Sequence, residues 1–267
     1  MHRRPPYERL YIYELKGYSR ELAGELGEGL LGVWVEGEES YVFFRRPAAE
    51  ELKRAAAAHG LELVGSYEMS YEQWQGGQVG EVEVGGLKIV PVWYGFKPGP
   101  RVLVIDPGVV FGGGAHPTTR LCLELLAMRA REGSLGRVVD LGCGSGILGL
   151  AAARWGAKEV VGVDLNPLCV ELARANAELN GIKLTAVEAD AVEAAGWEAD
   201  VVVANLPWAV LSEMLEGPLG GKGDVILGGL LRSQAREALW RLERLGYRVR
   251  QQLDEDFCWF AIWAVGG

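Results

Sequence analysis

The first quarter of the chain carries two kinds of apolar spacing, one typical of strands and one typical of helices. Leu10 and Ile12 alternate with two tyrosines, which predicts a strand. The same reading predicts strand, helix, strand, strand, helix and strand over residues 10–13, 19–26, 33–35, 41–44, 48–59 and 61–67. This order is that of a ferredoxin-like α+β fold. We therefore expect a small N-terminal domain over residues 1–69.

The next segment, residues 70–100, is rich in glycine and interrupted by prolines. The glycine pair at 85–86 separates two short apolar runs, which predicts a β-hairpin. We interpret this segment as a linker that carries a hairpin. The larger domain is then expected over residues 101–267.

Strands and helices alternate in the larger domain. The pattern predicts strands at 138–141, 160–163, 199–204 and 225–227, helices at 147–155, 167–180 and 233–245, and a closing antiparallel pair at 249–253 and 257–265. Local signals support the second helix, because Asn166 can cap it, Pro167 begins it and Gly181 follows it. This alternation predicts the α/β class, with a mostly parallel sheet.

The most informative motif is VVDLGCGSG at residues 138–146, which joins an apolar strand to a helix. In open α/β sheets, ligands bind beyond the carboxyl ends of the strands. Gly142, Gly144 and Gly146 let the backbone turn sharply and approach a ligand closely. Asp164 ends the next strand and can accept hydrogen bonds from ribose hydroxyls. These residues predict a nucleotide site.

The spacing of the glycines indicates which nucleotide. A dinucleotide motif reads G-x-G-x-x-G, and Ile147 stands where the third glycine would be. The observed form, with Asp140 before the glycines, resembles that of the Rossmann-like class I methyltransferases, and the resemblance implies S-adenosylmethionine as cofactor. A nicotinamide enzyme and a purely structural βαβ unit are the alternatives.

A second motif precedes the first, IDPGVVFGGGAHPTT at residues 105–119. It resembles the signature of the bacterial ribosomal protein L11 methyltransferase family, and the similarity continues through residues 120–125 and, more loosely, to the C-terminus. One difference is Gly113, where the family commonly has threonine. The resemblance implies a seven-stranded class I methyltransferase domain preceded by a small ferredoxin-like domain that presents the substrate.

The cofactor site expected from both motifs lies around the starts of two helices. Pro117 leaves the first amides of its helix free to bind the carboxylate of the cofactor's methionine moiety. The resemblance implies cofactor contacts by Thr119, Gly142, Asp164 and Asn205. Asp190 stands where methyltransferases often place an acid on the adenine amine, although it could equally cap a loop. The full expected set is Thr119, Asp140, Gly142, Gly144, Gly146, Asp164, Asp190 and Asn205.

The expected catalytic residues follow the strand at 199–204. Asn205 and the Leu206 carbonyl can both accept hydrogen bonds from one amine, and Pro207 adds no competing donor. Trp208 could hold a cationic amine against its ring. The sequence Asn-Leu-Pro-Trp is closer than the family's own to the N-P-P-aromatic motif of amide and adenine N-methyltransferases. An ordinary turn with a packed tryptophan is the structural alternative.

His116 and the cysteines are the other candidate reactive groups. His116 could act as a general base or could orient its loop, and we favour the second. Four cysteines are scattered without a C-x-x-C pair, which argues against a zinc site or a disulfide framework. We expect no metal.

Composition narrows the function classes further. The 267 residues are 49% hydrophobic and 24% charged, with no run long enough to span a membrane and no signal-type apolar segment. We therefore expect a cytoplasmic protein. A net charge of −9 argues against broad nucleic-acid binding. The best candidate basic patch is Arg241, Arg244, Arg248 and Arg250, which a solvated surface explains more simply.

These inferences predict an S-adenosylmethionine-dependent N-methyltransferase. The expected acceptor is a lysine or α-amino group of a protein, and the family resemblance implies a ribosomal protein as partner. Two alternatives are methyl transfer to an amide, nucleobase or small-molecule amine, and a non-catalytic cofactor-binding module.

Overall fold

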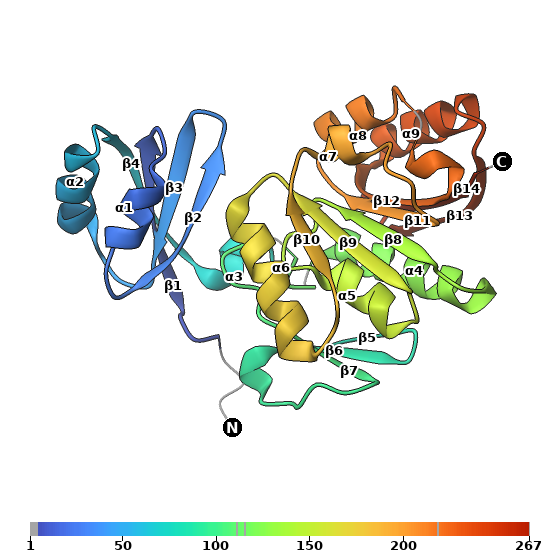
Figure 1. The fold of residues 1–267 in the computed structure, drawn as a ribbon, viewed down its shortest axis with the longest axis horizontal. Helices are drawn as coiled ribbons and strands as arrows, with labels where there is room; N and C mark the ends of the chain where they lie inside the picture. The colour runs from blue at the N-terminus through green and yellow to red at the C-terminus, as the bar shows by residue number, and fades with distance from the viewer. Residues whose placement is uncertain (1–4, 111, 115, 218, 267) are drawn as a thin grey trace.

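The computed structural model describes residues 5–110, 112–114, 116–217 and 219–266, and its strands form three sheets (Figure 1). The N-terminal sheet is antiparallel, with strand order β2-β3-β1-β4. Its elements are β1 (Arg9–Lys16), α1 (Arg20–Glu25), β2 (Leu30–Glu36), β3 (Glu39–Phe44), α2 (Ala49–Ala58) and β4 (Glu62–Ser70). Their order is the ferredoxin-like order that the sequence predicts.

The two faces of this small sheet pack in different directions. Tyr13 and Phe44 point toward α1 and α2 and form a core with them. Ile12 and Phe43 are one residue away in each strand and belong to a second cluster, which includes Val109 of the larger part of the chain. Because successive strand residues face opposite sides, one sheet can contact both its own helices and the rest of the molecule.

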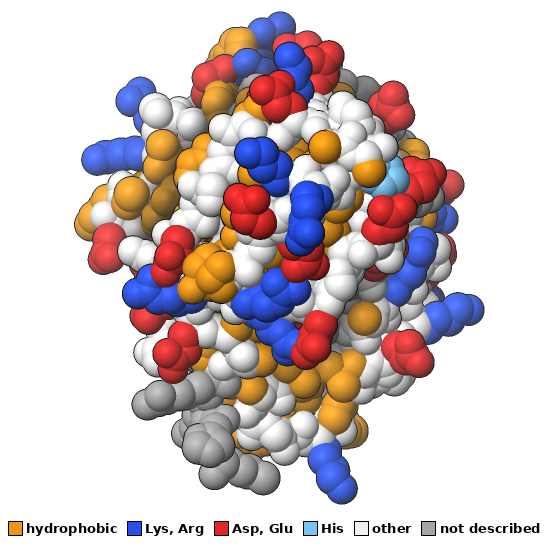
Figure 2. All heavy atoms as spheres, turned by 90° about the vertical axis from the view of Figure 1, so that its left-hand side faces the viewer, with side chains coloured by type: hydrophobic (Ala, Val, Ile, Leu, Met, Phe, Trp, Pro, Cys, Tyr) orange, Lys and Arg blue, Asp and Glu red, His pale blue; other side chains and the backbone are white. Residues whose placement is uncertain are grey.

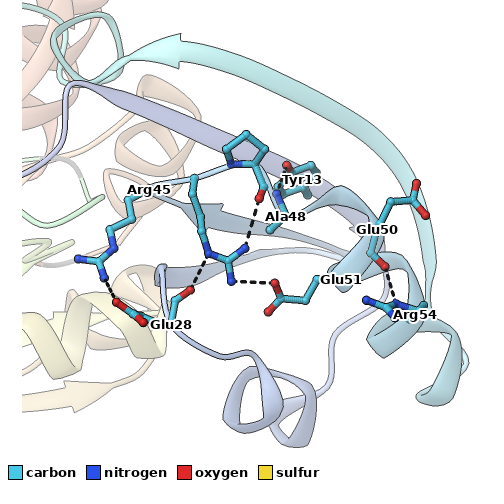
Figure 3. Close-up of polar contacts among 9 residues, drawn as sticks. Tyr13, Glu28, Arg45, Ala48, Glu50, Glu51 and Arg54 are labelled. Carbon is cyan, nitrogen blue, oxygen red and sulfur yellow. Dashed lines mark hydrogen bonds and ion pairs between the residues drawn. The ribbon is translucent and has the colours of Figure 1, made fainter.

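Polar contacts hold the loops of the small sheet (Figure 3). Arg45 pairs with Glu28 at 3.0 Å, and the Arg46 guanidinium donates to the Glu28 carbonyl at 2.9 Å and pairs with Glu51 at 2.7 Å. Most of these groups are exposed, and exposed ion pairs contribute only about 0–1 kcal/mol each. The buried aromatic core therefore contributes most of the stability of this unit.

A short helix and a three-stranded sheet follow. The elements are α3 (Tyr71–Trp74), β5 (Val82–Val84), β6 (Leu87–Pro91), the 3-10 turn Val92–Tyr94 and β7 (Val102–Ile105). β5 and β6 form the predicted antiparallel hairpin, and β6 also pairs in parallel with β7. The division of the chain at residues 69 and 100 stays a proposal, and this sheet spans the second of those positions.

The main sheet has seven strands in the order β10-β9-β8-β11-β12-β14-β13. The strands are β8 (Arg137–Leu141), β9 (Glu159–Asp164), β10 (Thr185–Glu188), β11 (Val201–Asn205), β12 (Asp224–Leu231), β13 (Arg248–Glu255) and β14 (Trp259–Val265). The first five pair in parallel, whereas β14 pairs antiparallel with both of its neighbours, β12 and β13. The predicted α/β class with seven strands is confirmed.

Helices cover both faces of the main sheet (Figure 1). They are α4 (Pro117–Glu132), α5 (Ile147–Arg154), α6 (Pro167–Asn180), α7 (Ala191–Ala194), α8 (Trp208–Met214) and α9 (Arg232–Arg244). Side chains of α7, α8 and α9 share one core with Val139 and Leu141, whereas α4 and α5 share another with Val138. The inner strands of the sheet are therefore buried on both sides, as their continuous apolar sequences predict, whereas the edge strands β10 and β13 alternate with exposed residues.

Two local features differ from the sequence prediction or were not foreseen. Phe257 was expected in the last strand, but it lies with Asp256 in the tight turn between β13 and β14, and both have positive φ. The register of β12 against β14 shifts between Leu227 and Leu230, which marks a β-bulge at two glycines. Both features lie at the edge of the sheet that carries the pocket described below.

The surface is polar and mixed in charge. Figure 2 shows the face on the left of Figure 1, where Lys and Arg side chains are interspersed with Asp and Glu side chains. Arg250 is exposed and pairs with Glu132, as favoured for the C-terminal arginines, whereas Arg241 pairs with Glu237 and is only 22% exposed. Among the described residues, no helix has the length and apolar character needed to cross a membrane.

Candidate functional site

A cavity of about 580 Å³ opens where β9, β8 and β11 end side by side. The strand order changes direction between β8 and β11, which is where open α/β sheets bind ligands. The described lining residues are Trp34, His116, Thr118, Gly142, Gly144, Asp164, Leu165, Cys169, Asp190, Ala191, Asn205, Leu206, Pro207, Val210, Gly229 and Trp259. The cavity thus brings together residues from both ends of the chain.

The glycine turn forms the floor of this cavity. Gly142, Gly144 and Gly146 all have positive φ, between 53° and 81°, which side chains with a Cβ rarely adopt. A Cβ on Gly142 would overlap the Leu206 side chain. The amide of Gly142 donates to the Val163 carbonyl at 2.8 Å, so the turn is tied to the neighbouring strand.

Asp164 lies at the end of β9 and faces both the turn and the cavity. Its Oδ2 accepts from the Gly144 amide at 2.9 Å and its Oδ1 accepts from the Asn166 amide at 3.0 Å. Burial raises the pKa of this carboxyl, and the two amide bonds oppose that shift. The position agrees with the one expected for an acceptor of ribose hydroxyls.

Two residues of the motif lie behind the turn and not on the cavity. Asp140 is 1% exposed, and its Oδ2 accepts from the Gly149 amide of α5 at 2.9 Å. Burial raises the pKa of Asp140 to about 7, and its Oδ1 is buried with no hydrogen-bond partner among the described residues. Gly146 instead lets α5 approach Ala173 of α6 closely. In the structure both residues hold the turn, and their expected cofactor contacts stay predictions.

Asn205 ends β11 and lines the cavity. Its Nδ2 donates to the Thr119 hydroxyl at 3.2 Å. Thr119 is 1% exposed and is not a described lining residue, whereas its neighbour Thr118 is. The first turn of α4 thus points the Thr119 hydroxyl toward β11, and its expected cofactor contact stays a prediction.

Leu206 and Pro207 continue along the cavity wall after Asn205. The Leu206 backbone lies against the β12 bulge, and a Cβ on Gly229 would overlap the Leu206 carbonyl oxygen. Gly229 has a φ of 80°. The bulge thus leaves room for the carbonyl that the sequence predicts as an acceptor, and no sequence motif had pointed to it.

Trp208 does not line the cavity, which corrects the expectation that its ring faces the acceptor amine. It begins α8, and its ring contacts the Arg241 guanidinium of α9 at 5.6 Å. Arg241 also donates to the Ser212 carbonyl of α8 at 2.6 Å. The helix turns the indole away from the cavity, and Val210 takes a place on the wall.

His116 lies at the mouth of the cavity as the N-cap of α4. Its Nδ1 lies 2.8 Å from the Thr118 hydroxyl and accepts from the Thr118 amide at 3.3 Å. The imidazole packs edge-on against Trp259, with ring centroids 4.8 Å apart. Burial first, and then Arg120, lower the pKa of His116, whereas Glu255 raises it. These contacts support the orienting role over the role of a general base.

Asp190 caps a helix and also lines the cavity, and its contact with the adenine amine stays a prediction. It lines the cavity, and its Oδ1 accepts from the Val192 amide at 2.6 Å as the N-cap of α7. Phe111 and Ala115, which belong to the second sequence motif, lie outside the described residues. Gly113, also in that motif, packs close to Gln75 and Val79.

Comparison with known proteins decides the family. The family profile named "Ribosomal protein L11 methyltransferase (PrmA)" matches residues 68–265, which is most of the chain. The chain belongs to the ribosomal protein L11 methyltransferase family. The resemblance noted in the two sequence motifs is thereby confirmed.

Individual members of the family agree with the profile. A ribosomal protein L11 methyltransferase from Dechloromonas aromatica is 44% identical over 200 residues, which are 70% of this chain and 66% of that protein. One from Pelotomaculum thermopropionicum is 40% identical over 66% of this chain and 58% of that protein. The match thus spans about two thirds of the length of these relatives, or less. A crystal structure of a ribosomal protein L11 methylase from Lactobacillus delbrueckii matches with TM-score 0.58 and 28% identity, over 67% of this chain and 93% of that one.

The chemistry of the cavity fits the cofactor expected for this family. Its described lining includes the carboxylates Asp164 and Asp190 and contains no Lys or Arg. Such a lining attracts a cation and gives no counter-charge to a pyrophosphate. S-adenosylmethionine carries a sulfonium cation, a ribose and no pyrophosphate, so the donor set suits it better than a dinucleotide. Among the described residues, no cluster of three His, Cys, Asp or Glu side chains could hold a metal ion.

Several lining residues were missed by the sequence reasoning. The main ones are Trp34, Leu165, Cys169, Gly229 and Trp259. Leu165 follows Asp164 directly and could have been found from the strand end alone. The two tryptophans lie on β2 and β14, far in sequence from either motif. Only the folded arrangement brings them to the cavity.

Proposed function

We propose that this chain is an S-adenosylmethionine-dependent N-methyltransferase that modifies lysine or α-amino groups of a ribosomal protein. One observation supports this most: Asn205 and Leu206 line the same cavity as Asp164, and the described lining contains no Lys or Arg side chain. The cavity therefore has a nucleotide-binding side and a side with hydrogen-bond acceptors for an amine. When bound, the cofactor supplies an electrophilic methyl group on its sulfonium.

The residues of the chain orient the amine. Because the Asn205 amide nitrogen donates to Thr119, the Asn205 side-chain oxygen is the atom of this lining residue that can accept from the amine. The Leu206 carbonyl offers a second acceptor, and Pro207 adds no N–H that could compete for it. Two acceptors for the two N–H bonds of a neutral amine fix the direction of its lone pair.

The amine must lose a proton before transfer. A lysine with a pKa near 10.4 needs roughly 4–5 kcal/mol to become neutral at pH 7. Burial in a cavity that also holds a sulfonium lowers the pKa of an amine, because both effects disfavour its charged form. A lowered pKa for His116 and its capping contacts fit a role in holding the cavity mouth. The proposed mechanism therefore needs no dedicated base.

The orientation of Trp208 removes one reason to consider planar acceptors, and it equally removes the ring predicted to hold a cationic amine. The Asn-Leu-Pro-Trp sequence was the reason to consider amides and nucleobases, whose flat groups could stack on that indole. The ring instead contacts Arg241 on the far side of α8. Without an aromatic surface at this position, the observation that suggested a planar acceptor is lost.

Methyl transfer can be tested directly. Purified chain, tritiated S-adenosylmethionine and total ribosomal proteins should give label that peptide mapping assigns to lysine or α-amino groups. The Asn205→Ala variant should transfer methyl groups much more slowly than the parent but should still bind S-adenosylhomocysteine, the demethylated product. Label found only in RNA or metabolites would reject the proposed acceptor class. Tight cofactor binding with no transfer to any acceptor would support the non-catalytic module.

A further inference from the structure

A tryptophan of the small N-terminal sheet lies on the nucleotide side of the cavity. Trp34 belongs to β2, the edge strand that faces α6 in Figure 1. It is half-buried and lines the cavity together with Asp164 and Leu165. The small sheet therefore contributes a wall to a site that the main sheet was expected to build alone.

Contacts on both sides of Trp34 fix its position. Two residues before it, Gly32 packs against Leu168 of α6, and a Cβ at this glycine would come within 2.8 Å of that side chain. One residue after it, the Val35 carbonyl accepts from the Asn166 side-chain amide at 3.5 Å. Asn166 is 4% exposed and also caps α6. The tryptophan is thus anchored to the segment that directly follows Asp164.

A second attachment joins α3, which follows the small sheet, to the loop at residues 108–110. Three side chains at and just after α3 bind three consecutive backbone carbonyls in residues 108–110. Tyr71 donates to Gly108 at 2.8 Å, Trp74 donates to Val109 at 2.9 Å, and Gln75 donates to Val110 at 3.0 Å. Tyr71 and Gln75 are 2% and 3% exposed, so these bonds are shielded from water. The loop cannot shift relative to α3 without breaking them.

The segment that contains these carbonyls also contacts the glycine turn. The Gly112 carbonyl accepts from the Ser145 hydroxyl at 2.7 Å, and Ser145 lies within the turn and is fully buried. Trp34 and Trp74 also line a common groove of the small sheet, where the Phe43 ring lies 4.9 Å from that of Trp74. The two attachments therefore belong to one packed unit.

We propose that the small sheet is a structural part of the cofactor site. Trp34 covers the adenosine moiety as an apolar wall beside Asp164, and Trp74 positions the loop that supports the glycine turn. Aromatic faces stack on heterocycles and attract cations, and both groups are present in an adenosyl sulfonium. The inference rests on the proposed function and deepens it by assigning two residues outside the main sheet to cofactor affinity.

The test is calorimetric titration of the full chain with S-adenosylhomocysteine. Trp34→Ala removes the wall, and Trp34→Phe keeps an aromatic ring. Trp74→Phe keeps the ring but removes the indole N–H that binds Val109. The matched control is Trp240→Ala, because Trp240 is 54% exposed on α9 and does not line the cavity. Melting temperatures of all variants are measured in parallel.

We expect Trp34→Ala and Trp74→Phe each to raise the dissociation constant for S-adenosylhomocysteine about tenfold, equivalent to about 1.4 kcal/mol. Trp34→Phe should recover most of that affinity, and the control should match the parent. If the parent binds and Trp34→Ala binds equally well, the inference is overturned and the proposed function stands. If the parent itself does not bind, the proposed function fails. If Trp34→Ala does not fold, the comparison uses Trp34→Phe, which should bind more tightly than Trp74→Phe. Equal or weaker binding by Trp34→Phe would also overturn the inference.

Discussion

The side-chain amide of Asn205 donates to the hydroxyl of Thr119 across 3.2 Å. This bond joins the end of β11 to the first turn of α4, two elements that are 86 residues apart in sequence. It fixes the amide nitrogen of Asn205 to α4 and leaves its oxygen as the acceptor atom. We therefore propose that Thr119 positions Asn205, whereas its direct contact with the cofactor stays a prediction.

Removing the Thr119 hydroxyl should therefore affect turnover more than cofactor binding. Thr119→Val keeps the shape of the buried side chain but leaves the Asn205 amide without its acceptor. We expect kcat to fall about tenfold, as for the loss of roughly 1–2 kcal/mol of hydrogen-bond energy. The dissociation constant for S-adenosylhomocysteine should stay within about twofold of the parent. A large loss of binding with unchanged kcat would restore Thr119 as a direct cofactor contact.

The β12 bulge offers a sharper test of the acceptor geometry. Gly229→Ala places a methyl group against the Leu206 carbonyl and should reduce kcat strongly. Gly246→Ala is a matched control, because Gly246 has a similar φ of 86° and nothing within 4 Å of its Cβ position. Both should lose about 1–2 kcal/mol of stability from backbone strain. Equal kcat in the two variants would contradict the role of the Leu206 carbonyl.

The buried Asp140 makes stability depend on pH in an unusual direction. Its pKa is about 7 in the folded chain against 3.8 for a free carboxyl, so the folded state binds a proton more tightly than the unfolded state. Its contribution to stability is fully present below about pH 4 and is lost as the pH rises to about 7. Asp140→Asn cannot titrate. As the pH rises over this range, the parent loses stability and the variant does not. The free energy of unfolding of the variant minus that of the parent should therefore increase by up to ~4 kcal/mol. Urea denaturation at several pH values measures it, and a constant difference would exclude the shift.

The two roles of His116 can be separated by two substitutions. Asn accepts a hydrogen bond at helix N-termini as well as His does, whereas Ala does not. His116→Asn should keep kcat within about threefold of the parent, and His116→Ala should lose about 1 kcal/mol of stability. Thermal unfolding and methyl-transfer rates give both values. A similar large loss of kcat in the two variants, with stability unchanged in one, would indicate a general base.

Local sequence signals predicted the elements that depend on local geometry. The helix Pro167–Asn180 was predicted with its observed ends, because its cap, its first-turn proline and its closing glycine all act within a few residues. Six strands of the main sheet were predicted from their apolar runs, whereas β10 (Thr185–Glu188) was missed and the number seven came from the family resemblance. The glycine turn has the positive φ values that its spacing required.

The parts that could not be predicted depend on partners far away in the chain. Trp208 resembled an acceptor-binding residue until Arg241 was found against its ring. Asp140 and Asp164 looked alike in sequence, but one lies beneath the turn and the other lines the cavity. Trp34 had no signal at all, because its place on the cavity depends on how β2 packs against α6. The spacing of glycines and apolar residues predicts where the backbone turns. The packing of distant segments decides which side chains line the cavity.

Equilibrium binding of S-adenosylhomocysteine to the purified chain tests the central claim most directly. The glycine turn and Asp164 should give one saturable site, with affinity lowered at least tenfold by Asp164→Ala and no comparable binding of a nicotinamide dinucleotide. Absence of binding by the parent chain, or preference for the dinucleotide, would contradict the account.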